Sequence, residues 1–178
     1  MPLPPMDVAA RARRLRLLLF DVDGVLTDAS VVIGAGGQET KTFSIRDGAA
    51  LVWARQIGLE VGLLSGRPSP ATTARAAELG IELVVQDGGS KRDSFARILA
   101  DRKITPEQVA YMGDDLADLP VIARAGLAGS PADAAPEVLA KSHWVSTKAG
   151  GHGAVREFIE FILKARGQWD PFVARQQD

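Results

Sequence analysis

Residues 17–28 read LLLFDVDGVLTD, a short apolar run that leads directly into two aspartates, Asp21 and Asp23, and then a glycine. In an open parallel sheet the inner strands are buried on both faces, and ligands bind beyond the carboxyl ends of the strands. This stretch therefore predicts a buried strand that ends at a binding site equipped with two carboxylates.

The rest of the chain alternates short apolar runs with stretches of helical character. Strands are predicted at 15–20, 59–64, 81–85, 109–112 and 126–128, and helices at 71–79, 91–100 and 154–164. This alternation is typical of βαβ units, so the predicted fold class is α/β with a doubly wound, mostly parallel, Rossmann-like sheet. Residues 31–43 break the rhythm with two short runs around a glycine-rich turn, which predicts a β-hairpin inserted after the first strand.

Length and charge set the expected domain organisation. The 178 residues suit a single domain, expected at 15–166, and residues 1–14 and 167–178 are expected to be loosely held tails. Lys and Arg total 21 against 22 Asp and Glu, so neither nucleic acid nor a membrane surface is an expected partner. No apolar run reaches the about 20 residues of a membrane span, and a cytoplasmic protein is expected.

Four polar features follow predicted strands and should meet at one edge of the sheet. Two like charges about 4 Å apart repel by on the order of 4 kcal/mol at an effective dielectric near 20, so clustered carboxylates favour a bound cation. Oxygen ligands alone indicate Mg²⁺. The features are Asp21 with Asp23, then Ser65 with Arg67, then Lys91, and finally Asp114.

These residue types suit phosphoryl transfer. Lys91 and the Ser65 hydroxyl can hold phosphoryl oxygens while the Asp21 carboxylate attacks phosphorus, which would give an aspartyl-phosphate. Asp23 could protonate the leaving oxygen and later take a proton from the hydrolytic water. Residues 66–90 provide one helix and one strand between Ser65 and Lys91, too little for a lid domain, so the fold is expected to be capless.

The four features, in this order, resemble the motifs of the haloacid dehalogenase-like phosphatase superfamily. The matching segments are DVDGVLTD at 21–28, SGR at 65–67, Lys91, and GDD at 113–115 followed by Asp118. The resemblance implies Asp21 as nucleophile, Asp23 as acid and base, and Ser65 and Lys91 as phosphate ligands. It also implies Mg²⁺ held by Asp21, Asp114 and the backbone carbonyl of Asp23.

Further segments are similar to one branch, the phosphatases of 3-deoxy-D-manno-octulosonate 8-phosphate (KDO 8-phosphate), which serve lipopolysaccharide biosynthesis. They are FSIRDG at 43–48, AYMGDDLADLP at 110–120, PADA at 131–134 and GGHGAVRE at 150–157. Such enzymes are capless, Mg²⁺-dependent homotetramers in which the hairpin and a neighbour's C-terminal tail help close each site. Besides Asp23 and Lys91, the resemblance implies substrate contacts from Ser44, Ile45, Arg46, Asp47, Gly48, Arg67 and Arg75.

One position departs from this branch. Family members usually carry an arginine where this chain has Val52, and Arg55 is the next basic residue along the predicted helix. A phosphatase for a nine-carbon sugar-acid phosphate, or for another small phosphorylated metabolite, therefore stays open, although Arg67 favours the eight-carbon sugar.

Two functions of another class also stay open. A phospho-acceptor receiver domain would accept phosphate near Gln86 and Asp87, after the third strand, and a catalytically silent domain would serve a sugar-activating partner enzyme. His143 and His152 have no imidazole or thiol partner nearby in the sequence and are expected to be structural.

Overall fold

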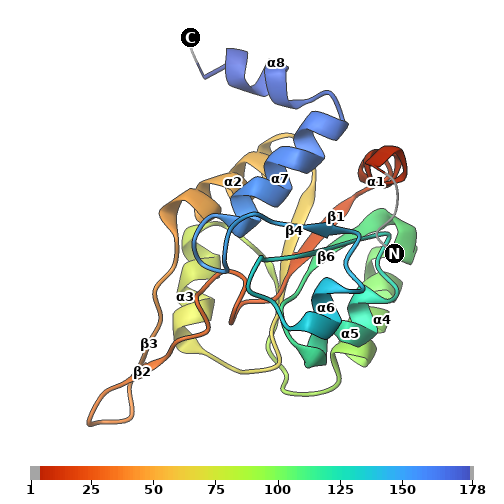
Figure 1. Cartoon of the computed structure of the whole chain (residues 1–178). Coiled ribbons are helices and arrows are strands. Elements are labelled where there is room, and N and C mark those ends of the chain that lie inside the picture. The colour runs from red at the N-terminus through yellow and green to blue at the C-terminus, as the bar shows by residue number, and fades with distance from the viewer. Residues whose placement is uncertain (1–4, 177–178) are drawn as a thin grey trace.

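The central sheet has six parallel strands in the order β5-β4-β1-β6-β7-β8. Figure 1 shows its central strands β1, β4 and β6 between helices. The structure, a computed structural model, describes residues 5–176. The strands are β1 (Leu17–Phe20), β4 (Glu60–Leu64), β5 (Leu83–Val85), β6 (Val109–Met112), β7 (Leu127–Ser130) and β8 (Trp144–Val145). They agree with the predicted strands to within a few residues, and β8 was not predicted.

β1 lies at the centre and is buried along its whole length. Leu18 and Phe20 belong to one hydrophobic cluster and Leu17 and Leu19 to the other, because successive side chains of a strand point to opposite faces. Apolar side chains at all four positions thus fit a strand covered on both faces.

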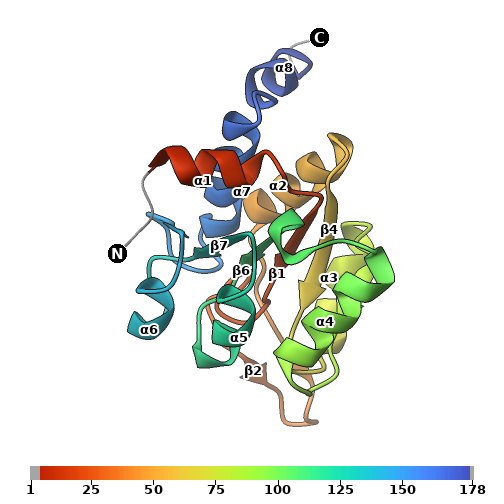
Figure 2. The same cartoon turned by 90° about the vertical axis from the view of Figure 1, so that its right-hand side faces the viewer.

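Helices cover both faces of the sheet (Figure 2), which confirms the doubly wound α/β fold. One face carries α1 (Pro5–Ala12), α2 (Ile45–Gln56), α3 (Pro70–Glu78) and α7 (Ala154–Ala165). The other carries α4 (Lys91–Arg102), α5 (Leu119–Ile122) and α6 (Pro136–Leu139), with the 3₁₀ turns η1 (Pro106–Gln108) and η2 (Leu116–Asp118) among these elements. None of the described helices is long and apolar enough to cross a membrane.

The helix that follows β4 begins where its sequence predicts. The Ser69 hydroxyl accepts a hydrogen bond from the Thr72 amide at 3.3 Å, and Pro70 occupies the first turn, where its missing N–H is not needed. Gly80, with φ of +66°, follows the helix end. This cap fixes the position of residues 65–69, which lead from β4 towards the site.

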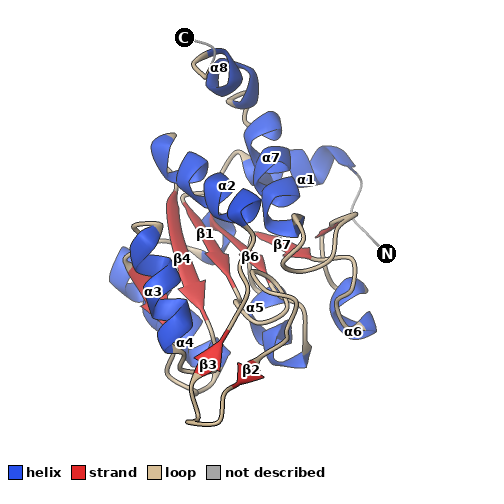
Figure 3. Ribbon diagram, turned by 90° about the vertical axis from the view of Figure 1, so that its left-hand side faces the viewer, coloured by secondary structure: helices blue, strands red, loops and turns tan. Residues whose placement is uncertain are grey.

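Residues 31–43, here called the arm, contain a two-stranded antiparallel sheet between β1 and α2. β2 (Val32–Ile33) pairs with β3 (Glu39–Thr40), so the paired part is shorter than the predicted hairpin. Figure 3 shows the arm beyond the carboxyl end of β4, at the edge of the sheet where the polar features were predicted to gather.

Both ends of the described chain form helices where loosely held tails were expected. Val8 and Ala12 of α1 are buried in the core, and Phe172 of α8 (Trp169–Ala174) is buried against Trp53, with ring centroids 5.4 Å apart. Each helix is too short to show a clear apolar period in the sequence, and burial depends on partners elsewhere in the chain. α8 lies at the opposite end of the molecule from the arm (Figure 3).

Candidate active site

The loop after β1 carries the first two aspartates to the carboxyl edge of the sheet. The Asp21 amide still donates to Met112 O at 2.9 Å, so this residue extends the register of β1 against β6. Gly24 then adopts φ of +87°, and a Cβ placed on it would lie 1.9 Å from Asp114 Oδ2. Only glycine fits there, and the close approach packs the loop against Asp114.

Three carboxylates meet at this edge. Asp21, Asp114 and Asp118 each offer an oxygen within 4.8 Å of the other two. Lys91, the first residue of α4, lies among them with Nζ 2.9 Å from Asp21 Oδ2 and 2.5 Å from Asp118 Oδ1. The structure thus brings together Asp21, Lys91 and Asp114, as the sequence predicts.

Burial and the neighbouring carboxylates both shift the pKa values of the cluster, with burial as the larger cause for Asp21 and Asp114. Burial, followed by the charge of Asp118, raises the pKa of Asp21 to about 7, although Lys91 opposes the rise. Burial and the charges of Asp21 and Asp118 raise the pKa of Asp114 to about 8. Burial alone would lower the pKa of Lys91, but Asp21 and Asp118 outweigh it and the pKa is raised.

Hydrogen bonding decides which of these oxygens can take a cation. Asp118 Oδ1 accepts from Tyr111 OH at 2.5 Å as well as from Lys91, and Oδ2 accepts from the amides of Asp114 and Asp115. Asp114 Oδ1 is buried and has no hydrogen-bond partner among the described residues. An orphaned, buried carboxylate oxygen beside a second carboxylate fits Mg²⁺, so Asp21 and Asp114 would hold the ion and Asp118 would not.

This arrangement predicts a pH-dependent stabilisation by Mg²⁺. Because the folded-state pKa values of Asp21 and Asp114 lie above the ordinary value of 3.8, the metal-free protein should lose stability as pH rises from about 4 to about 8. Mg²⁺ removes this penalty by displacing the protons, so it should raise Tm more at about pH 8 than at about pH 6. At about 100 times its Kd we expect a gain of about 5–10 °C at the higher pH.

Thermal unfolding with Mg²⁺ or with a chelator, at both pH values, measures this gain. Asp114→Asn is the variant expected to lose most of it. An equal rise in Tm at both pH values would contradict the assignment of Asp21 and Asp114 as the Mg²⁺ ligands.

Ser65 and Arg67 lie on the neighbouring strand end. Ser65 is buried, and its Oγ accepts from the Arg67 amide at 3.2 Å. A Cβ placed on Gly66 would lie 3.9 Å from Lys91 Cε, so this loop runs beside the lysine. The Arg67 guanidinium is half exposed and pairs with Glu39 of the arm.

The predicted sugar-acid contacts on α2 and α3 have other partners. Both carboxylate oxygens of Asp47 accept amides at the start of α7, from Gly153 at 3.1 Å and Arg156 at 2.8 Å. Arg75 passes over Gly48 and bonds Ser44 O and Glu78. These side chains hold helices together and do not join the carboxylate cluster.

Ser44, Ile45 and Arg46 form the start of α2. The Ser44 hydroxyl caps the helix by accepting from the Asp47 amide at 3.2 Å. Ile45 is 81% exposed, and Arg46 lines a cavity of about 550 Å³ together with His152 and residues of α7. Within the part of the chain that the structure describes, neither side chain makes a polar contact with the carboxylate cluster.

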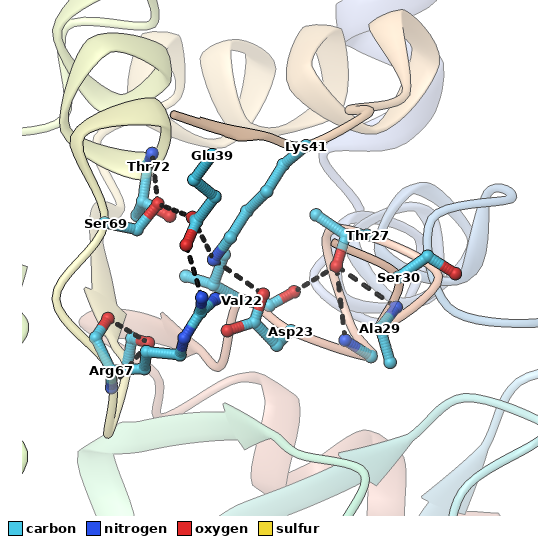
Figure 4. Close-up of polar contacts among 12 residues, drawn as sticks. Val22, Asp23, Thr27, Ala29, Ser30, Glu39, Lys41, Arg67, Ser69 and Thr72 are labelled. Carbon is cyan, nitrogen blue, oxygen red and sulfur yellow. Dashed lines mark hydrogen bonds and ion pairs between the residues drawn. The ribbon is translucent and has the colours of Figure 1, made fainter. Parts of the chain in front are cut away.

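Several residues at the site were assigned no role from the sequence. The sequence places Asp118 at the end of a motif without a role of its own, and it gives no sign that Tyr111 or Lys41 belongs to the site. Spacing pointed to Asp118, but the buried pairing of Lys41 with Asp23, at 2.7 Å (Figure 4), depends on how the arm folds back. Arg55 does not replace the arginine missing at position 52, because its guanidinium bonds Leu79 O.

The two histidines have structural contacts, as predicted. His143 Nδ1 accepts from the Ala128 amide at 2.9 Å, and His152 Nδ1 lies 2.8 Å from Gly150 O. Neither belongs to the carboxylate cluster.

Comparison with known proteins identifies the family. The haloacid dehalogenase-like hydrolase family matches residues 38–126. The 3-deoxy-D-manno-octulosonate 8-phosphate phosphatase KdsC of Escherichia coli K12 is 42% identical over 164 residues, which cover 92% of this chain and 87% of that protein. The chain belongs to the KDO 8-phosphate phosphatase branch of this family.

Solved structures of KDO 8-phosphate phosphatases share the fold. The Yersinia pestis enzyme is 42% identical, with a TM-score of 0.89 over 92% of this chain and 89% of that one. The Moraxella catarrhalis enzyme, solved with a magnesium ion, a phosphate ion and a KDO molecule, is 35% identical, with a TM-score of 0.94 over 97% and 99%. The resemblance read from the sequence motifs is therefore confirmed.

Proposed function

We propose that this protein is a Mg²⁺-dependent phosphomonoesterase that hydrolyses KDO 8-phosphate to KDO and phosphate, a step of lipopolysaccharide biosynthesis, and that it acts in the cytoplasm. The observation that carries the proposal is the cluster of Asp21, Asp114 and Lys91 at the carboxyl edge of the sheet. The similarity to KDO 8-phosphate phosphatases over 92% of the chain supports the choice of substrate.

The proposed reaction has two displacements at phosphorus. A carboxylate oxygen of Asp21 attacks, the bond from phosphorus to the sugar oxygen breaks, and Asp23 gives that oxygen a proton. Asp23 then takes a proton from water, which attacks the aspartyl-phosphate and returns Asp21 and inorganic phosphate.

Electrostatics and positioning supply most of the rate in phosphoryl transfer. Lys91 Nζ, 2.9 Å from Asp21 Oδ2, can bind a phosphoryl oxygen while it orients the nucleophile. We assign Ser65 as the second phosphoryl ligand because it lies in the loop that runs beside Lys91. Mg²⁺, when held by Asp21, Asp114 and the Asp23 carbonyl, would neutralise charge on the transferring group.

The arm offers a surface for a second copy of the chain. Val32 and Ile33 are 65% and 61% exposed, and Ile45 at the base of the arm is 81% exposed. Large exposed apolar side chains gathered on one segment indicate a contact surface. They support the expected homotetramer, in which the arm would help close a neighbouring site and keep water out of a capless crevice.

The alternatives fit the structure less well. Asp87, near which a receiver domain would accept phosphate, instead bonds Ser94, Arg97 and the Gly89 amide around the first turn of α4. A silent domain would need no basic residue paired with the nucleophile. Among sugar-acid substrates, Arg67 beside the arm suits the shorter KDO, although Val52 leaves the nine-carbon sugar as the second candidate.

A phosphate-release assay tests this proposal. We expect turnover of KDO 8-phosphate only with Mg²⁺, slower turnover of a nine-carbon sugar-acid phosphate, and the slowest turnover of glucose 6-phosphate as the control. Faster hydrolysis of the hexose phosphate would reject the substrate assignment, and no hydrolysis of any ester would favour the silent domain.

A further inference from the structure

The arm carries a buried lysine that the proposed reaction does not use. Lys41 follows β3, and its side chain is 0% exposed. Its Nζ lies 2.7 Å from Asp23 Oδ1 and 3.6 Å from Glu39 Oε1 (Figure 4). Removing an ammonium from water is costly unless carboxylates lie beside it, and these two acids offset that cost.

Asp23 depends on this contact for its orientation. Its side chain is 26% exposed, and Lys41 is the sole partner recorded for its carboxylate in the described part of the chain. A carboxylate that transfers a proton must lie within hydrogen-bond reach of the oxygen that receives it. Neither Asp23 Oδ1 nor Lys41 Nζ has a hydrogen-bond partner among the described residues, so their ion pair is the charged contact that restrains the carboxylate, and it leaves Oδ2 for that oxygen.

Glu39 anchors the lysine to a helix end. Ser69 Oγ donates to Glu39 Oε1 at 2.6 Å, and the Arg67 guanidinium pairs with the other oxygen (Figure 4). Ser69 also caps α3, and therefore does not move freely. The hydroxyl of the α3 cap thus bonds Glu39, and two ion pairs of Lys41 connect Glu39 to Asp23.

Stability alone does not account for this pair. Replacing a buried ion pair with apolar side chains of similar volume is often neutral or stabilising, so such a pair is weak evidence of a stabilising role. We propose that Lys41 is a positioning residue that holds the Asp23 carboxylate in the orientation from which it transfers protons. This inference rests on the proposed function.

The two proton transfers can be separated by the choice of ester. A sugar oxygen needs a proton to leave, whereas the p-nitrophenolate ion leaves without one. With p-nitrophenyl phosphate a misoriented Asp23 should therefore slow only the second displacement, the attack of water on the aspartyl-phosphate.

The test compares Lys41→Met with the wild-type protein. With KDO 8-phosphate, kcat should fall by about 100-fold, a typical contribution of general acid–base catalysis, while KM changes by less than about twofold. With p-nitrophenyl phosphate, the variant should release about one equivalent of p-nitrophenolate in a burst and then turn over slowly. Lys41→Arg should recover part of kcat, and Lys141→Met, an exposed lysine elsewhere, is the matched control.

Several outcomes would overturn the inference. Lys41 would have another role if Lys41→Met has unchanged kinetics or shows only a rise in KM. The same conclusion would follow if kcat falls equally with both esters and no burst occurs. Glu39→Gln keeps the lysine and should show the same burst with a smaller loss of kcat, so it tests the inference if the Lys41 variants do not fold. If the Lys41 variants do not fold and Glu39→Gln has wild-type kinetics, the role of Lys41 is structural. A wild-type protein that hydrolyses neither ester would instead reject the proposed function.

Discussion

Asp21→Asn should reduce phosphate release from KDO 8-phosphate by on the order of 10⁴-fold or more, since removal of a nucleophile in other enzymes costs that much. The amide cannot form an acyl phosphate, and it is a poorer ligand for Mg²⁺ than a carboxylate. A quenched-flow phosphate assay measures the loss, and incubation with labelled substrate should trap no phosphorylated protein.

The same substitution should leave the protein more stable without metal. Burial and Asp118 raise the pKa of Asp21 to about 7, which shows that its charged form is disfavoured in the fold. The neutral amide removes that cost, so at about pH 8 with a chelator the variant should have a higher Tm than the wild type. Asp101→Asn, an exposed change on α4, should alter neither the rate of phosphate release nor Tm. Turnover retained by Asp21→Asn would reject this residue as the nucleophile.

The sequence predicts the sheet and the acidic cluster well because both depend on local patterns. Four buried apolar residues in β1 need cover on both faces, and polar residues that follow parallel strands must share one edge. These two facts place Asp21 and Asp114 at one edge, and Lys91 reaches the same edge from the start of α4. Gly24 is a local signal of the same kind, because its positive φ lets the loop approach Asp114.

The features that the sequence does not predict depend on contacts between distant segments. α8 is held by Phe172 on Trp53, and Asp47 by amides of α7 more than one hundred residues along the chain. Neither contact has a periodic or motif signal. The contact of Lys41 cannot be predicted for the same reason. An alternating strand pattern does not distinguish a solvated lysine from one that lies against Asp23.

Asp118→Ala should be strongly destabilising, and this effect depends on four contacts of one carboxylate. Asp118 is fully buried, and its oxygens accept from Lys91, Tyr111 OH and two backbone amides. Alanine would leave the buried ammonium of Lys91 without one of its two carboxylate partners and three further donors unsatisfied. Loss of one partner from a buried ion pair costs about 3–5 kcal/mol, which corresponds to a fall in Tm of about 10 °C for a chain of this size.

Two neighbouring changes make this prediction specific to the carboxylate. Asp118→Asn keeps one acceptor oxygen and should be intermediate, because its NH₂ group cannot accept from the donors on the other side. Asp115→Ala removes an exposed carboxylate that caps η2, where it accepts the Leu116 amide, and should cost about 1 kcal/mol, the usual loss for a helix cap. Thermal unfolding at one pH, with a chelator present, separates the three variants. Similar Tm values for Asp118→Ala and Asp115→Ala would contradict the view that Asp118 holds Lys91 in place for the nucleophile.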